Sequence, residues 1–188
     1  MGTRTFISVN IDNRETLENL VATQKTLNAT GADIKTVEPE NIHITLKFLG
    51  EIPETQVQRV KEKIIEISFT PIKLEIEEIG VFPNHRRPRV IWAGVKGEIE
   101  QLRQVFKELE EKLQTIGIKK ERRRFQPHIT IGRVRGGRNR ENLLHELLQL
   151  QNTRYGEIIV NHISFMKSEL TRQGPIYTQL AASTHISG

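Results

Sequence analysis

The chain contains one short pattern twice, and this repetition limits the folds that it can adopt. The segment NIHITLKFLG carries His43 and the segment FQPHITIGRV carries His128, so the two copies lie 85 residues apart in a chain of 188. A strand-like run precedes each copy at nearly the same offset, at residues 5–9 and 90–95. An offset of about half the chain indicates two copies of one structural unit.

Helical periodicity follows each strand-like run, over residues 14–29 and 98–115. Gly31 and Gly117 come just after these segments, where a left-handed residue ends many helices. Each half then continues with the His-containing strand, a second helix and a closing strand. The second helices are expected at 53–67 and 139–150, the closing strands at 72–76 and 157–164, and a tail strand near 177–181.

The repeated order predicts an α+β fold with two pseudo-symmetric halves, each built as strand–helix–strand–helix–strand. We expect antiparallel-rich sheets to line a central cleft and the helices to lie outside. The whole chain, residues 1–188, is expected to form a single bilobal domain. Its halves would span about 1–85 and 86–188, with residues 78–89 as the crossover between them.

Composition narrows the class of protein. Hydrophobic residues make up 36% and charged residues 27%, which is typical of a folded, water-soluble chain. The longest apolar run falls short of the roughly 18 residues that span a bilayer, and no signal segment is visible. We therefore expect no membrane contact, a cytoplasmic location and a monomer. Without cysteine, the chain cannot form disulfides, use a thiol nucleophile or bind zinc through thiolates.

The two repeated strands carry side chains suited to phosphodiester chemistry. Positions i and i+2 of a strand share one face, so His43 lies beside Thr45 and His128 lies beside Thr130. An imidazole has an ordinary pKa near 6.5, so one ring can be neutral while the other is protonated. One ring could take a proton from a water nucleophile while the other gives a proton to the leaving oxygen. The threonine hydroxyls could donate hydrogen bonds to the phosphate oxygens.

Two other interpretations of these strands compete with catalysis. A single His-x-Thr in a strand is usually structural, but two copies at matched places favour a functional site. Paired histidines can also bind a metal ion, which usually recruits a third ligand such as a carboxylate. Neither strand carries a carboxylate on its polar face. We therefore expect no metal and no cofactor.

The segments HITLKFLG and QPHITIGR resemble the paired His-x-Thr-x motifs of the 2H phosphoesterase superfamily. Within it, the chain is most similar to the RNA 2′,3′-cyclic phosphodiesterases, which are also called 2′-5′ RNA ligases. The resemblance extends over essentially the whole chain. It includes residues 4–7 at the start, and residues 168–170, Gly174 and Tyr177 near the end.

The resemblance implies an enzyme that hydrolyses a terminal 2′,3′-cyclic phosphate of RNA to a 2′-phosphomonoester. It also implies some capacity to join tRNA half-molecules through a 2′-5′ linkage. By analogy, His43 would be the proton donor and His128 the proton acceptor, with Thr45 and Thr130 holding the phosphate. RNA with a cyclic phosphate end, including tRNA halves, is then the expected partner. No ATP-binding loop is visible, so ATP-dependent ligation is not expected.

Basic residues favour the same partner. The formal net charge is +5 and the pI is about 9.6, which favours a polyanionic ligand. Arginine and lysine cluster before and after the second His-containing strand, and Arg89, Arg123 and Arg133 are candidates for contacts with the RNA backbone. Phe48, expected on the face of His43, and Tyr177 are candidates for stacking on a base. A solvated basic surface and aromatic residues in the core are the plainer alternatives.

Two further functions remain open at the level of sequence. The protein could be a non-catalytic RNA-binding module that kept the fold, in which case binding would depend steeply on salt and no turnover would occur. It could also apply the same chemistry to a small cyclic nucleotide instead of RNA.

Overall fold

Residues 2–186 are described by a computed structural model, and their elements follow the repeated order. The first half contains β1 (Thr3–Asn10), α1 (Arg14–Ala29), β3 (His43–Ile52), α2 (Glu54–Ile65) and β5 (Ile72–Phe82). The second half contains β6 (Val90–Gly97), α3 (Ile99–Gln114), β7 (His128–Val134), α4 (Arg140–Leu150) and β8 (Arg154–Val160). The α+β class with strand–helix–strand–helix–strand in each half is confirmed. Gly31 and Gly117 have the expected positive φ, at 73° and 87°.

Shorter elements and a C-terminal hairpin complete the chain. They are β2 (Ile34–Thr36), a 3-10 turn (Pro39–Asn41), β4 (Ser68–Phe69), β9 (Ser164–Thr171), β10 (Gly174–Ala182) and β11 (Thr184–His185). The main sheet has the strand order β10-β9-β1-β3-β7-β6-β5-β8, with β2 also paired to β7. All its pairings that the structure describes are antiparallel, whereas the small β11–β4 pair is parallel.

The sheet register carries the same 85-residue offset as the sequence. Strands β3 and β7 pair at Ile44 and Ile129, which are equivalent residues of the two copies. Ile72 pairs with Val160 and Glu75 with Glu157, and adding 85 to one half converts the first of these pairs into the second. Both contacts between the halves are therefore consistent with a pseudo-two-fold relation.

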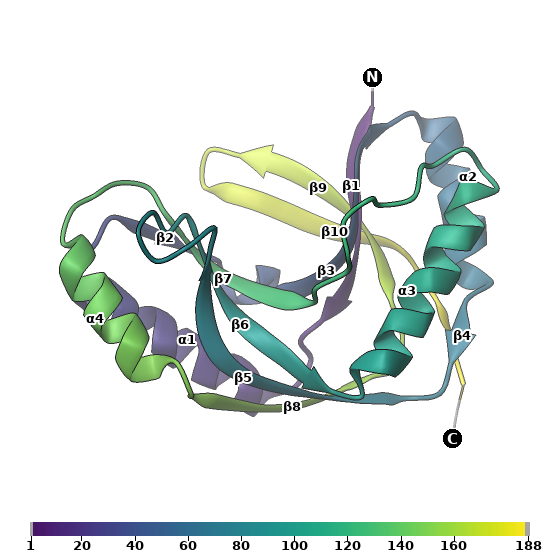
Figure 1. Ribbon diagram of the computed structural model, residues 1–188. Helices are drawn as coiled ribbons and strands as arrows, with labels where there is room; N and C mark the ends of the chain where they lie inside the picture. The colour runs from purple at the N-terminus through teal and green to yellow at the C-terminus, as the bar shows by residue number, and fades with distance from the viewer. Residues whose placement is uncertain (1, 187–188) are drawn as a thin grey trace.

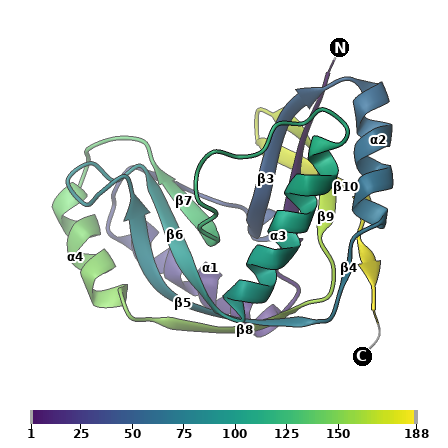
Figure 2. The same ribbon diagram turned by 45° about the vertical axis from the view of Figure 1, so that its right-hand side comes forward.

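The helices of the two sequence halves are interleaved in space (Figures 1 and 2). Helices α1 and α4 contact each other and cover the part of the sheet that contains β5, β7 and β8. Helices α2 and α3 form a second pair, in which α2 also contacts β9 and β10. Each pair takes one helix from each half of the sequence. The His-containing strands β3 and β7 lie between the two helix pairs.

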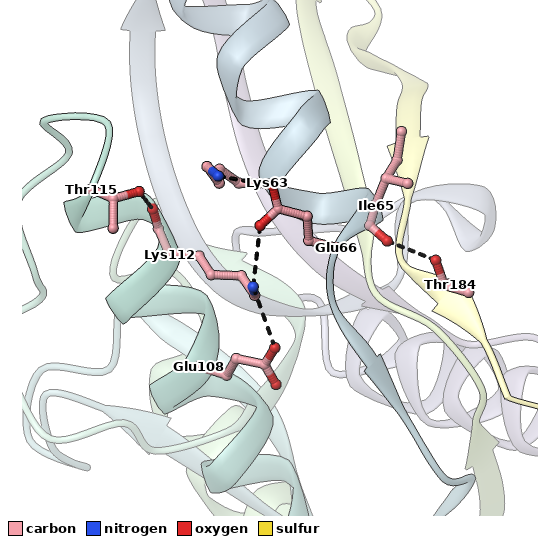
Figure 3. Close-up of polar contacts among 7 residues, drawn as sticks. All are labelled: Lys63, Ile65, Glu66, Glu108, Lys112, Thr115 and Thr184. Carbon is pink, nitrogen blue, oxygen red and sulfur yellow. Dashed lines mark hydrogen bonds and ion pairs between the residues drawn. The ribbon is translucent and has the colours of Figure 1, made fainter.

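An ion-pair cluster links α2 to α3, as Figure 3 shows. The carboxylate of Glu66 lies 2.8 Å from the ammonium of Lys63 and 3.2 Å from that of Lys112. The hydroxyl of Thr184 donates to the carbonyl of Ile65 at 2.6 Å, which attaches the C-terminal strand to the end of α2. These exposed pairs contribute little each, so burial of the apolar helix faces supplies most of the stability here.

Two strand boundaries differ from the sequence prediction. Strand β5 continues past residue 76 to Phe82, because a bulge at Glu78, with φ of 67°, absorbs one residue without ending the pairing with β6. The crossover between halves is therefore confined to residues 83–89. The single strand expected over 157–164 is two strands, since β8 pairs with β5 whereas β9 crosses to β1. Among residues 2–186, no helix has the length and apolar character that crossing a bilayer requires.

The contact between Ile44 and Ile129 should be a main source of stability. Both side chains are fully buried, so Ile129→Ala should lower the free energy of unfolding by roughly 2–5 kcal/mol through lost burial and a residual cavity. Chemical denaturation would measure this loss. The same substitution at Ile159, which is 53% exposed on β8, is the matched control and should cost much less. Equal losses in the two variants would contradict a core role for the contact.

Candidate active site

One pocket brings together the polar residues of both His-containing strands. It encloses about 350 Å³, and His43, Thr45, His128 and Thr130 all line it. The β9–β10 hairpin forms another wall, and the start of β1 and the segment around β2 complete it. The remaining lining residues are Arg4, Phe6, Lys35, Thr36, Val37, Glu38, Asn41, Phe48, Arg133, Ser168, Gln173, Gly174, Pro175 and Tyr177.

Matched bulges decide which side chains follow the threonines into this pocket. In β3 the register with β1 skips Leu46, and in β7 the register with β6 skips Ile131, again 85 residues later. Each bulge leaves two successive buried residues and reverses the alternation beyond it. Phe48 and Arg133, which are equivalent positions, therefore join the pocket face. Strict alternation would have turned both away from it.

The bulge in β3 also turns Lys47 into the interior. Its ammonium lies 2.5 Å from the carboxylate of Glu110 in α3, and both side chains are only 6% exposed. It also donates to the carbonyl of Lys119 at 2.9 Å, and the other Glu110 oxygen accepts from the Glu121 amide at 2.5 Å. This buried pair connects β3 and α3 to the segment that leads into β7. Sequence reasoning missed it, because a lysine in a strand usually faces solvent.

Equivalent hydrogen bonds orient the two imidazoles. Nδ1–H of His43 donates to the carbonyl of Asn41 at 2.6 Å, and Nδ1–H of His128 donates to the carbonyl of Gln126 at 2.8 Å. A carbonyl oxygen can only accept, so the proton in each bond belongs to Nδ1. This leaves Nε2 of each ring to exchange a proton. Nε2 of His43 lies 2.8 Å from the hydroxyl of Thr45, which can donate to it.

The surroundings of the two rings are not equivalent. His43 stacks on Phe6 at 5.0 Å between centroids and meets the edge of Tyr177 at 5.6 Å. His128 has an edge contact with Phe82 at 5.1 Å. Burial lowers the pKa of His43 below its ordinary value of 6.5. The bond to Asn41 opposes this change, and the charge of His128 adds to it. The empty site thus favours neutral His43 at neutral pH.

Asn41 holds His43 to the hairpin wall of the pocket. Its buried side-chain amide donates to the carbonyl of Pro175 at 2.9 Å, while its own carbonyl accepts from His43. Asn41, Phe6 and Pro175 were not predicted as site residues. The only signal for Asn41 was its place two residues before the histidine, which matches Gln126 in the second copy.

The other predicted contact residues are divided between the pocket and its surroundings. Phe48 lies at the mouth, 53% exposed, with the guanidinium of Arg4 4.6 Å from its ring centroid. Arg133 and Tyr177 line the pocket, and burial raises the pKa of the Tyr177 phenol, which stays protonated. Arg89 lies in a neighbouring groove. Arg123 is exposed in the segment between α3 and β7 and lines neither cavity.

Metal ligands do not gather in this pocket. Within residues 2–186, no group of three or more histidine or carboxylate side chains is placed to hold an ion. The donor set around His43 and His128 consists of hydroxyls, carbonyls and cations, which suits an anionic ligand.

The titration of His43 offers a direct test of this environment. In an NMR titration its midpoint should lie below pH 6.5, because burial penalises the imidazolium form. Tyr177→Ala should raise that midpoint, because it removes the edge contact and admits water. Phe82→Ala, which alters the surroundings of His128 instead, is the control and should move it less. A wild-type midpoint at or above 6.5 would contradict the account.

Comparison with known sequences identifies close relatives. The LigT-like phosphoesterase family model matches the chain twice, over residues 11–92 and 94–177. A Methanothermobacter thermautotrophicus protein named RNA 2′,3′-cyclic phosphodiesterase is 38% identical over 183 residues, covering 96% of this chain and 97% of the relative. A protein of the same name from Archaeoglobus fulgidus is 37% identical over 179 residues, covering 94% and 97%.

Solved structures show the same fold. A protein of Thermus thermophilus has a TM-score of 0.76 and 27% identity, covering 95% of this chain and 96% of its own. LigT of Escherichia coli in its apo form also has a TM-score of 0.76, at 22% identity, covering 98% and 99%. The likeness to the E. coli protein bears on the fold alone.

Proposed function

We propose that this chain, which belongs to the LigT-like phosphoesterase family, hydrolyses the 2′,3′-cyclic phosphate at the end of an RNA to a 2′-phosphomonoester. The observation that carries the proposal is the convergence of His43, Thr45, His128 and Thr130 on one pocket. The names of the two archaeal relatives support the same substrate class.

The proposed reaction is a displacement at phosphorus. A water molecule attacks, and the bond between phosphorus and O3′ breaks. His128 accepts the proton of the water through Nε2, and His43 donates the proton of its Nε2 to O3′. After the product leaves, His43 regains a proton from solvent and His128 loses one. The bonds from Nδ1 to backbone carbonyls hold each ring in the tautomer that these steps require.

Substrate binding would also prepare His43 for its role. In the free protein the hydroxyl of Thr45 can donate to Nε2 of His43, and burial keeps the ring neutral. A cyclic phosphate is an anion, so its arrival stabilises the imidazolium form and raises the pKa of His43. The hydroxyls of Thr45 and Thr130 then donate to the non-bridging oxygens, where negative charge grows in the transition state.

The same arrangement would support ligation of tRNA halves. If the 5′-hydroxyl of a second RNA takes the place of water, the same proton transfers join the two ends through a 2′-5′ phosphodiester. This step exchanges one ester bond for another, so it is reversible and consumes no ATP. The cytoplasmic location and monomeric state stay predictions from the sequence.

Replacement of either histidine should abolish most of the activity. With an oligoribonucleotide that ends in a 2′,3′-cyclic phosphate, His43→Ala and His128→Ala should each lower the hydrolysis rate by at least roughly 100-fold. Phosphorus NMR in the presence of EDTA would identify the product as a 2′-phosphate. His145→Ala, on the exposed face of α4, is the matched control and should retain the wild-type rate.

Full activity in either active-site variant would refute the two-histidine mechanism. RNA binding without turnover in the wild-type protein would favour the non-catalytic module. Turnover of a mononucleoside cyclic phosphate but not of the oligonucleotide would favour a small-nucleotide enzyme.

A further inference from the structure

A second, wider groove adjoins the active-site pocket. It encloses about 820 Å³, and Lys35 and Arg133 line both cavities. Six of its lining side chains are cationic, and no aspartate or glutamate is among the lining residues of the described part of the chain. The complete lining is Lys35, Arg87, Pro88, Arg89, Val90, Arg133, Val134, Arg135, Gly136, Gly137 and Arg140.

The cations of this groove are not neutralised within the protein. Lys35 and Arg133 are directly paired residues of β2 and β7, so their side chains share one face at close range. Like charges that oppose each other across a ladder destabilise a sheet. The ion pairs of residues 2–186 involve other cations, and none includes any of the six. An anionic ligand would offset this repulsion.

Backbone contacts hold the frame of the groove in place. The amide of Val134 donates to the carbonyl of Arg89 at 2.9 Å, and the amide of Arg135 donates to that of Asp33 at 2.8 Å. Gly136 packs so closely against Asp33 that a Cβ would come within 2.6 Å of the carboxylate. The guanidinium of Arg140 donates to the carbonyl of Arg86 at 3.4 Å, which ties the crossover segment 83–89 to α4. These loops lie beside β2 and α4 in Figure 1.

We infer that this basic groove binds the phosphodiester backbone of the RNA strand that leads up to the cyclic end. The inference rests on the proposed function, because it places the terminal phosphate between His43 and His128. From there the strand passes Lys35 and Arg133, which border both cavities, and enters the groove. Arginine forks make charge-assisted, bidentate bonds to phosphate oxygens. The substrate is therefore an RNA strand rather than a mononucleotide.

The arrangement separates two basic clusters that are adjacent in sequence to the second His-containing strand. The cations of segment 133–140 that line the groove lie after β7, together with Arg87 and Arg89. The run from Lys119 to Arg124 lies before β7, and none of its residues lines either cavity. The groove thus assigns backbone binding to the first cluster alone.

The test uses a variant that changes the groove without touching the pocket. In Arg87→Gln/Arg135→Gln, kcat/KM for a five-nucleotide RNA with a 2′,3′-cyclic end should fall by roughly 3–30-fold at low salt. Its kcat/KM for a mononucleoside 2′,3′-cyclic phosphate should stay at the wild-type value. Arg59→Gln/Lys107→Gln, which removes two exposed cations from α2 and α3, is the matched control and should leave both substrates unaffected.

Binding of the product oligonucleotide, followed by fluorescence anisotropy, separates the groove from the chemistry. The slope of log K against log salt should be smaller in the groove variant by about 1.4, at roughly 0.7 for each lost phosphate contact with a single strand. An unchanged slope together with unchanged kcat/KM for the oligonucleotide would overturn the groove while the proposed function stands. Arginine-dependent binding in a wild-type protein that turns over neither substrate would keep the groove and overturn the proposed function.

Discussion

The antiparallel contact between β3 and β7 is the constraint on which the site depends. Ile44 and Ile129 pair directly and are fully buried, so the residues on either side of them point to the opposite face. That face carries His43, Thr45, His128 and Thr130. Burial of the apolar side chains, which is favourable by itself, therefore brings two imidazoles and two hydroxyls together. The same register positions the core and the polar pocket.

Duplication supplies equivalent geometry, and the environment then makes the two copies different. Both rings donate from Nδ1 to a carbonyl two residues earlier, and both strands bulge one residue after the threonine. The hairpin β9–β10 lies on one side only, where Tyr177 contacts His43. Arg133 occupies the position equivalent to Phe48, so one side of the pocket is cationic and the other aromatic. Acid–base catalysis by two like groups needs such a difference in environment.

The sequence was sufficient for the order of elements, because helical and strand periodicities and the repeat agreed with one another. It could not reveal the bulges at Leu46 and Ile131, since an extra residue in a strand leaves the composition unchanged. For the same reason the inward turn of Lys47 and the approach of Arg133 to the pocket needed the structure. The break between β8 and β9 was missed, because residues 157–164 read as one apolar run. The interleaved helix pairs depend on strand order, which the local sequence does not encode.

The division of labour between His43 and His128 is the central claim, and a change of leaving group tests it most directly. A 3′-deoxynucleoside 2′-(p-nitrophenyl phosphate) places at phosphorus a leaving group that needs no proton. If His43 is the acid, His43→Ala should hydrolyse this compound at nearly the wild-type rate, whereas His128→Ala should remain roughly 100-fold slower. Equal losses in both variants, on this compound and on the cyclic phosphate alike, would contradict the assignment of separate acid and base roles.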